Sequence, residues 1–280
     1  MKKLFTSLLL ASIFIVSCKD KKENKPPVVV VVDTLPPPTG DTLKILPDVE
    51  LVNKEMDEKV ASFKRKKPIP PPPPPDVPPT QTTPEFCILY DFDGHNVSKT
   101  MWNVSGDIPC ANSGFNVVQQ KEIVDSGRSY FSQFMSGIYV TNDSTIFLQY
   151  SSFKRMRVVF TTSNEWYGSS AGGVAYINSA NWGDGSPAFV FTKLLGYSSR
   201  YSGDAGAHEA GHTLGCRHQS SWSGGVKVSD YNWGGCPITC GSAPIMGASY
   251  NQPQPKWWIG LNSLGIIQND TSVIKATVRQ

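Results

Sequence analysis

Beyond position 85, apolar residues gather in short runs separated by polar turns, a pattern typical of β-strands. Five runs predict strands over 86–90, 138–141, 157–161, 174–177 and 189–192. Apolar positions at helical spacing predict helices over 121–135 and 144–153. A further helix is expected over about 204–214, with Asp204 as its N-terminal cap. Strands that alternate with helices predict an α/β domain of three layers.

This domain is expected over 85–280, which is long enough for one substantial core. It carries 13 Lys and Arg residues against 13 Asp and Glu residues, so the mildly basic pI of the chain, about 8.4, comes from the residues before it. A near-neutral domain has no electrostatic footprint for nucleic acid, and we expect no such partner. We expect the protein to be a monomer.

The N-terminus has the pattern of an export signal. Lys2 and Lys3 precede an apolar stretch over 4–16 that is too short to cross a bilayer comfortably. We interpret 1–17 as a lipoprotein signal peptide because residues 15–18 resemble a bacterial lipobox, in which Cys18 is lipidated and anchors the chain. An ordinary cleaved signal and an unprocessed anchor are the alternatives.

The residues after Cys18 bear on the membrane. Lys19 stands where an Asp commonly retains lipoproteins in the inner membrane, and the charged run 19–23 is similar to surface-export signals of some Gram-negative lipoproteins. We therefore expect a lipid-anchored protein of the cell envelope, at the outer membrane or cell surface of a Gram-negative bacterium. Which membrane face it occupies stays open.

The most informative chemistry lies in residues 208–218, which read H-E-x-x-H-x-x-G-x-x-H. On a helix, His208 and His212 project from one face and can bind one metal ion, while Glu209 lies beside the ion and can accept a proton from a bound water. Gly215 lets the chain leave the helix with a backbone angle that a side chain resists, and the turn brings His218 round as a third ligand. Three protein nitrogens with one open position are typical of catalytic Zn²⁺.

A second motif follows at 243–247, Ala-Pro-Ile-Met-Gly, which looks like the Met-turn that places a methionine, here Met246, beneath a zinc site. Together the two motifs resemble the metzincin clan of zinc metallopeptidases over 208–246, and 91–94, 166–168 and 172–176 are similar to its reprolysin-like bacterial members. Gln219 departs from the acidic residue that many members have after the third histidine. Ala248 departs from the Tyr that astacin- and serralysin-like members have two residues after the Met. Tyr250 is offset from that position, and we do not assign it the role of stabilising a tetrahedral oxyanion.

The resemblance implies a metzincin-like three-layer domain with a mixed twisted sheet, an active-site helix and a Met-turn. It also implies a zinc endopeptidase in which Glu209 is the general base. A peptide substrate is expected along an antiparallel edge strand, here 174–177, although an internal strand is the alternative. Two other functions remain open, a non-catalytic zinc-containing surface binding protein and a zinc amidase or deacetylase that acts on cell-wall material. The intact Glu209 weighs against the first.

Residues 18–84 hold 16 of the 22 prolines and are expected to form a disordered Pro-rich tether, which polyproline geometry would allow to reach at most roughly 200 Å. Within it, Leu51, Met56, Val60 and Phe63 have helical spacing, which predicts a helix in 50–67. That helix is either a spacer, which we favour, or a segment that folds back over the active-site cleft.

Five cysteines follow Cys18, and an exported protein can oxidise them. We expect a bridge between Cys87 and Cys110 and another from Cys216 to Cys236 or Cys240, the alternative for the last three being a second metal site. The turn at 181–185 is expected to be plain loop, with Ca²⁺ binding as the weaker alternative. The segment 257–259 forms either a pocket wall or core, and His95, the fourth histidine, is not expected to be a ligand.

Overall fold

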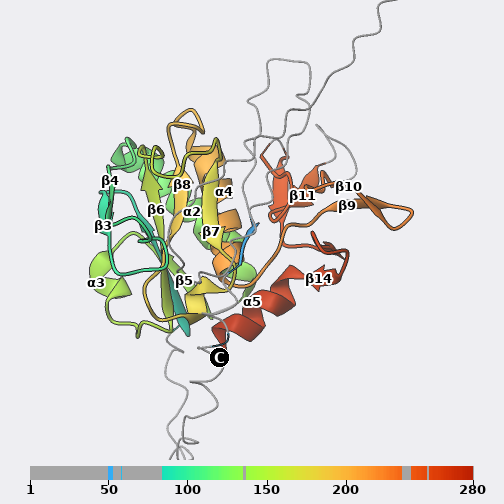
Figure 1. Cartoon of the computed structure of the whole chain (residues 1–280), viewed down its shortest axis with the longest axis horizontal. Helices are drawn as coiled ribbons and strands as arrows, with labels where there is room; N and C mark the ends of the chain where they lie inside the picture. Colours follow the sequence, from blue (N-terminus) through green and yellow to red (C-terminus); the bar gives the residue numbers. More distant parts are fainter. Residues whose placement is uncertain are drawn as a thin grey trace, which may run out of the picture.

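A six-stranded mixed sheet forms the centre of the protein, with strand order β1-β7-β8-β6-β2-β5 (Figure 1). The computed structural model describes residues 50–52, 58, 84–134, 137–234, 241–250 and 252–279. The expected signal peptide, Cys18, Cys236 and Cys240 lie outside these ranges. The strands of the sheet are β1 (Glu50–Leu51), β2 (Phe86–Asp91), β5 (Ile138–Thr141), β6 (Arg155–Thr161), β7 (Gly173–Tyr176) and β8 (Ala188–Phe191).

Strands β5, β2, β6 and β8 are parallel, β7 is antiparallel to β8, and β1 runs parallel to β7. All five predicted strands are present within two residues of the expected bounds, which confirms the α/β class and a mixed sheet. These strands were recognisable because both faces of the sheet are covered, so their residues form nearly continuous apolar runs.

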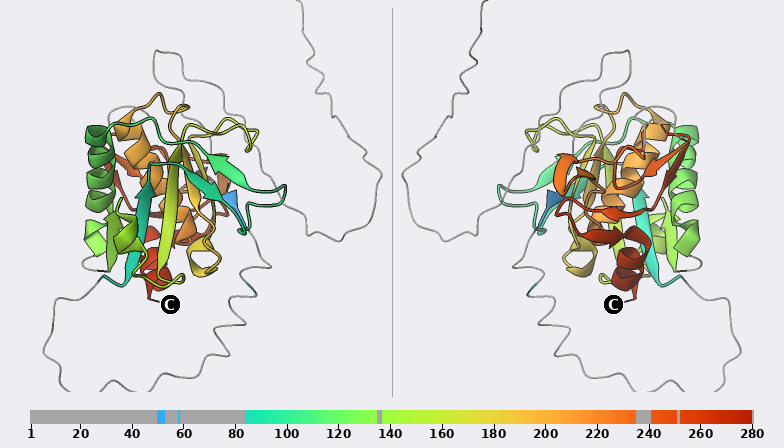
Figure 2. Two further views of the ribbon diagram at one scale, coloured as in Figure 1. Left: turned by 90° about the vertical axis from the view of Figure 1, so that its left-hand side faces the viewer. Right: turned by 90° about the vertical axis from the view of Figure 1, so that its right-hand side faces the viewer.

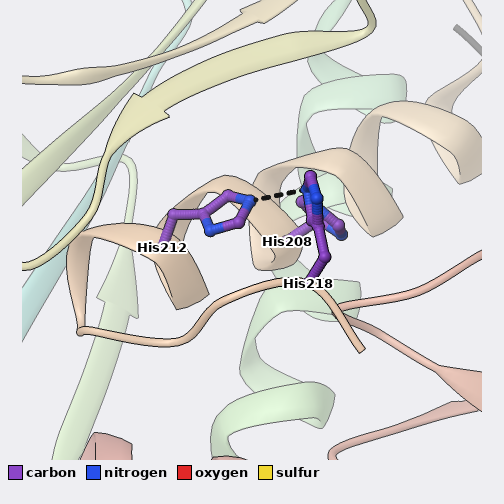
Figure 3. Close-up of side chains that lie close together, drawn as sticks. All are labelled: His208, His212 and His218. Atoms are coloured by element: carbon purple, nitrogen blue, oxygen red, sulfur yellow. Dashed lines mark hydrogen bonds between the residues drawn. The ribbon is translucent and has the colours of Figure 1, made fainter. Parts of the chain in front are cut away.

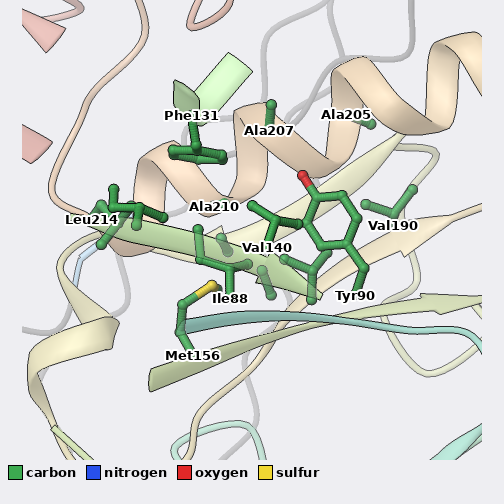
Figure 4. Close-up of a cluster of buried hydrophobic side chains, with 14 of the residues drawn as sticks. Ile88, Tyr90, Phe131, Val140, Met156, Val190, Ala205, Ala207, Ala210 and Leu214 are labelled. Carbon is green, nitrogen blue, oxygen red and sulfur yellow. The ribbon is translucent and has the colours of Figure 1, made fainter. Parts of the chain in front are cut away.

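Helices α2 (Val117–Phe131) and α4 (Ser199–Thr213) cover one face of the sheet (Figure 2). Ile88 and Tyr90 of β2 point toward this layer and meet Ala207 and Ala210 of α4 in the main core (Figure 4). The alternate residues of β2 face the opposite side, where Leu89 packs against the short helix α3 (Ser144–Phe147). The small side chains on α4 allow this helix to lie close to the sheet. This packing positions the helix that carries His208 and His212.

Helix α4 begins at Ser199, five residues before the expected start. The side chain of Ser198 caps it by accepting a hydrogen bond from Tyr201 N–H, so Asp204 is not the cap. Asp204 is buried inside the helix layer, where its carboxylate accepts a hydrogen bond from the hydroxyl of Tyr130. The first turns were missed because small and polar residues, which carry no apolar periodicity, are buried there against neighbouring elements.

The two other predicted helices also differ from their expected bounds. Asn116 and Gln119 form a capping box, so α2 starts at Val117 rather than at 121 and ends at Phe131, followed by the 3₁₀ helix η1 (Ser132–Phe134). Helix α3 has a single turn after its cap Asp143 and does not continue to 153.

Strand β1 comes from the segment expected to be a tether. Glu50 and Leu51 pair with Ala175 and Tyr176 of β7, so they form a strand rather than the start of a helix. Most of the remaining positions of the expected helix lie outside the described ranges. Because β1 pairs with β7, β7 is not the outermost strand over these residues, and the expectation of a free edge over 174–177 is wrong there.

Smaller elements complete the fold. They are the pairs β3 (His95–Val97) with β4 (Ile108–Cys110), β9 (Ser221–Ser223) with β10 (Val226–Ser229), β11 (Ser242–Pro244) with β12 (Gln254–Lys256) and β13 (Ile259–Leu261) with β14 (Ile267–Asn269), together with η2 (Ser179–Asn181) and α5 (Asp270–Val278). Within the described ranges, none of the helices combines the length and apolar character that a membrane span requires.

Candidate metal centre

Three histidine side chains converge at the C-terminal end of α4 (Figure 3). His208 and His212 lie one helical turn apart, and His218 approaches them from the segment that follows the helix. One ring nitrogen from each lies within 4.8 Å of the others, and the Nε2 atoms of His212 and His218 are 3.1 Å apart. Two nitrogens bound at about 2.0–2.1 Å to a tetrahedral zinc ion are separated by roughly 3.3 Å, so the cluster could hold such an ion.

The other ring nitrogen of each α4 histidine contacts a backbone carbonyl. Nδ1 of His208 lies 2.6 Å from the oxygen of Ile245, and Nδ1 of His212 lies 2.8 Å from the oxygen of Cys216. Because a carbonyl oxygen can only accept, these contacts place the proton on Nδ1 and leave Nε2 as the electron-pair donor. The rings are therefore oriented for a metal by the fold itself.

The chain turns after α4 at Gly215, whose φ of +98° lies in the left-handed region, as the sequence predicts. The N–H of Cys216 donates to the oxygen of Gly211 and closes the end of the helix. Helix α5 supports the turn, since the hydroxyl of Thr277 donates to the oxygen of Leu214. This supported turn directs the chain back toward α4 and delivers His218.

Met246 lies in a tight turn below α4. The N–H of Gly247 donates to the oxygen of Pro244, which closes the turn around Ile245 and Met246. Met246 is fully buried, and a Cβ added at Gly211 would lie only 2.4 Å from its sulfur. The turn thus packs against α4 between the two histidines. The backbone carbonyl of Ile245, the residue before Met246, is the one that orients His208.

Gln219, the residue directly after His218, has a structural role in this protein. Its N–H donates to the oxygen of Met246, and its side-chain amide donates to the carboxylate of Asp270 at 2.7 Å. Burial raises the pKa of Asp270, and the amides of Gln219 and Gln268 oppose that effect. A carboxylate at position 219 would place two acids together in a buried site, whereas the amide satisfies Asp270.

Glu209 is buried beside the histidines, with 2 % of its surface exposed. Its neighbour across the site is Gly173 at the start of β7, where an added Cβ would lie 2.5 Å from Oε1 of Glu209 and 2.6 Å from the oxygen of Phe189. At Gly172, an added Cβ would lie 3.0 Å from the hydroxyl of Tyr250. The absence of side chains at the start of β7 therefore provides the space that Glu209 occupies.

Two residues of the site were missed by the sequence analysis. The ring of Tyr231 lies against that of His218, with centroids 4.7 Å apart. Glu50 accepts hydrogen bonds from the backbone N–H of His218, from Arg217 at 2.9 Å and from the hydroxyl of Ser263 at 2.6 Å. Neither has a spacing that relates it to the histidine motif, so no local pattern could have identified them.

The remaining candidate residues lie elsewhere. His95 is in β3, where its ring lies 3.3 Å from the guanidinium of Arg157, and among the described residues only the three clustered histidines form a possible metal group. The carboxylate of Asp184 accepts from the N–H and hydroxyl of Ser186, which supports the plain-loop interpretation over a Ca²⁺ site. Trp257 is buried in the core and packs against Phe131, so it is not a pocket wall.

The expected disulfides are not formed in the described residues. Cys87, Cys110 and Cys216 are buried free thiols. Cys87 lies against α3 while Cys110 belongs to a separate cluster with Val97 and Phe189, so the two thiols are kept apart by the fold. Burial raises the pKa of the Cys216 thiol, and it lies against the backbone oxygen of Asp270.

No protein-family model matches the chain, and no curated protein matches it either.

Proposed function

We propose that the protein is a zinc-dependent endopeptidase of the metzincin type. The observation that carries this proposal is the convergence of three oriented imidazoles with the buried carboxylate of Glu209 beside them. His208, His212 and His218 would hold the ion. A zinc ion bound there supplies Lewis-acid polarisation of a carbonyl and lowers the pKa of a coordinated water to about 7.

Glu209 is the residue that moves a proton. Its carboxylate accepts the proton of the attacking water and passes it to the departing amine, because it is the acid–base group adjacent to His208 on the same helix. The absence of a side chain at Gly173 provides the space that this carboxylate occupies beside the histidines. A metal site that served only structure would have no use for such a group.

The substrate is proposed to be an extended peptide of an envelope or extracellular protein. Strand β7 is antiparallel to β8, and its first residue, Gly173, borders Glu209, whereas among the described residues β1 pairs with Ala175 and Tyr176. Backbone groups at an unpaired strand segment can bind a peptide in extended form. Lipidation at Cys18 and attachment to the outer membrane belong to the same proposal, because they would bring the site to such substrates.

The test is cleavage of a peptide library by the purified full chain, together with its metal content. We expect stoichiometric zinc and cleavage at defined side-chain preferences, both lost after chelation, and loss of cleavage alone in Glu209→Gln. A zinc-loaded chain that cleaves no peptide would contradict the proposal and would favour the binding-protein or amidase alternatives.

A further inference from the structure

The three histidines differ in what orients them. His208 and His212 are oriented by backbone carbonyls, whereas the atom that faces Nδ1 of His218 is Oε1 of Glu50, at 3.6 Å. The same carboxylate oxygen accepts a hydrogen bond from the backbone N–H of His218. The third histidine therefore donates a backbone hydrogen bond to a side chain that lies 168 positions earlier in the sequence, and its ring faces the same carboxylate oxygen.

Glu50 is fixed in place by the sheet. Strand β1, the short blue strand in Figure 1, pairs with β7 at Ala175 and Tyr176, and the N–H of Ile177 donates to the oxygen of Leu51 at 2.7 Å. The side chain of Leu51 is buried in the cluster that contains Val174. These contacts restrict where the carboxylate of the preceding residue can lie.

The second oxygen of the carboxylate is occupied as well. Oε2 of Glu50 accepts from Arg217 at 2.9 Å and from the hydroxyl of Ser263 at 2.6 Å, and the side chain is 12 % exposed. A nearly buried carboxylate with these donors is an ordered acceptor rather than a mobile surface charge. The carboxylate of Glu50 also links β1 to the segment that carries His218 and to the turn before β14.

We propose that Glu50 is a positioning residue of the metal centre. The inference rests on the proposed function, since it assigns a role at the same three-histidine site. A carboxylate beside Nδ1 keeps the proton on that nitrogen, directs Nε2 toward the other two histidines and increases its basicity as a ligand. The functional unit consequently begins no later than Glu50, and not at residue 85.

In an alternative role, β1 would be a blocking segment that prevents a peptide from binding to β7. A strand on the outer side of β7 occupies backbone groups that a peptide could use, so removing its anchor could increase cleavage. The two roles have different consequences for metal binding. Loss of a positioning residue weakens the binding of zinc, whereas loss of a blocking segment leaves zinc affinity unchanged and increases turnover.

The experiment measures zinc affinity of the full chain by competition with a chelator, for Glu50→Ala, Glu50→Gln and the matched control Glu58→Gln. Glu58 is an exposed glutamate of the same N-terminal segment. We expect Glu50→Ala to lower zinc affinity about 10–100-fold, Glu50→Gln to lower it less, and Glu58→Gln to behave like the wild type. The spectrum of the Co²⁺-substituted protein should change in the two Glu50 variants only.

Unchanged zinc affinity and an unchanged Co²⁺ spectrum in both Glu50 variants would overturn the inference, and increased cleavage alongside them would identify β1 as a blocking segment. Glu50→Gln retains the size of the side chain, so it decides the question if Glu50→Ala fails to fold. A wild-type chain that binds no zinc, or binds it and cleaves nothing, would instead contradict the proposed function. A failure of the proposed function is therefore distinguishable from a failure of the positioning role of Glu50.

Discussion

No side chain fits between Gly211 and Met246. An added Cβ at Gly211 would lie 2.4 Å from the Met246 sulfur and 3.0 Å from the ring of Trp257. Gly211 stands at one of the unspecified positions of the histidine motif, yet the turn packs against the helix at this point. This contact sets how closely the turn around Met246 packs against α4. It thereby also sets the position of the Ile245 carbonyl, which orients His208.

Gly211→Ala should destabilise the protein by about 1–3 kcal/mol through overpacking. Met246→Ala alone should cost about 2–5 kcal/mol, because it removes a fully buried side chain. The double variant should be more stable than the sum of the single effects predicts, since the shortened side chain makes room for the new methyl group. Urea unfolding of the four proteins measures the coupling, and strict additivity would show that the two residues do not share this contact.

Glu209→Gln should retain the metal and lose catalysis. The amide has the size of the carboxylate but cannot accept the proton, so we expect peptide turnover to fall about 10²–10⁴-fold. Zinc content by atomic absorption and peptide turnover are measured on the same sample. Turnover near that of the wild type would remove Glu209 from the mechanism.

Gly173→Ala should impair catalysis through Glu209. The new methyl group would meet both Oε1 of Glu209 and the oxygen of Phe189, and the backbone oxygen cannot move aside easily. We expect turnover to fall by at least tenfold while zinc affinity changes little, because the histidine contacts are untouched. Gly137→Ala is a control at a glycine whose added Cβ has its nearest neighbour at 3.3 Å. Equal turnover in the two variants would contradict the prediction.

The stability of the protein should depend on pH through Asp204. Burial raises the pKa of this carboxyl to about 7 from its ordinary value of 3.8, although Tyr130 and Arg200 act in the opposite direction. Between these two values the folded state holds a proton that the unfolded state has released. The corresponding stability is fully present below about pH 4 and is lost as the pH rises toward 7.

Asp204→Asn should remove this dependence, because the amide keeps the acceptor for the Tyr130 hydroxyl and does not titrate. The difference in unfolding free energy between the variant and the wild type should change in favour of the variant between pH 4 and pH 7, by on the order of 4 kcal/mol. Denaturant unfolding at several pH values provides the measurement. A difference that is constant with pH would show that Asp204 is already ionised in the folded protein.

The five main strands could be predicted from sequence because they are buried on both faces. Each is therefore visible as a run of neighbouring apolar residues. The three histidines could be predicted as a group because the helix and Gly215 determine their geometry over eleven residues. The start of α4 could not, since Ser202 and Asp204 are polar and nevertheless buried. The burial of Asp204 depends on its hydrogen bond with Tyr130, which comes from another helix.

Glu50 marks the limit of the sequence analysis most clearly. Its segment is rich in proline and has the composition of a tether, and the apolar spacing around Leu51 suggested a helix. The strand forms because β7 offers an unpaired side, and the carboxylate becomes ordered because Arg217 and Ser263 lie beside it. Those partners are brought together only in the folded domain, so no window of sequence contains them.

Under the proposed lipid anchor at Cys18, the pairing of β1 with β7 would shorten the chain between the membrane and the folded domain. With a lipid at Cys18, the connecting chain runs from 18 to 50, which is 50 − 18 = 32 residues, rather than to residue 84. Extended polyproline of that length would span about 100 Å, so the reach that the proposed anchor would give the domain is half of that expected for a tether ending at residue 84. A pull on the anchor would load β1 first, and through Glu50 it would act on the third histidine.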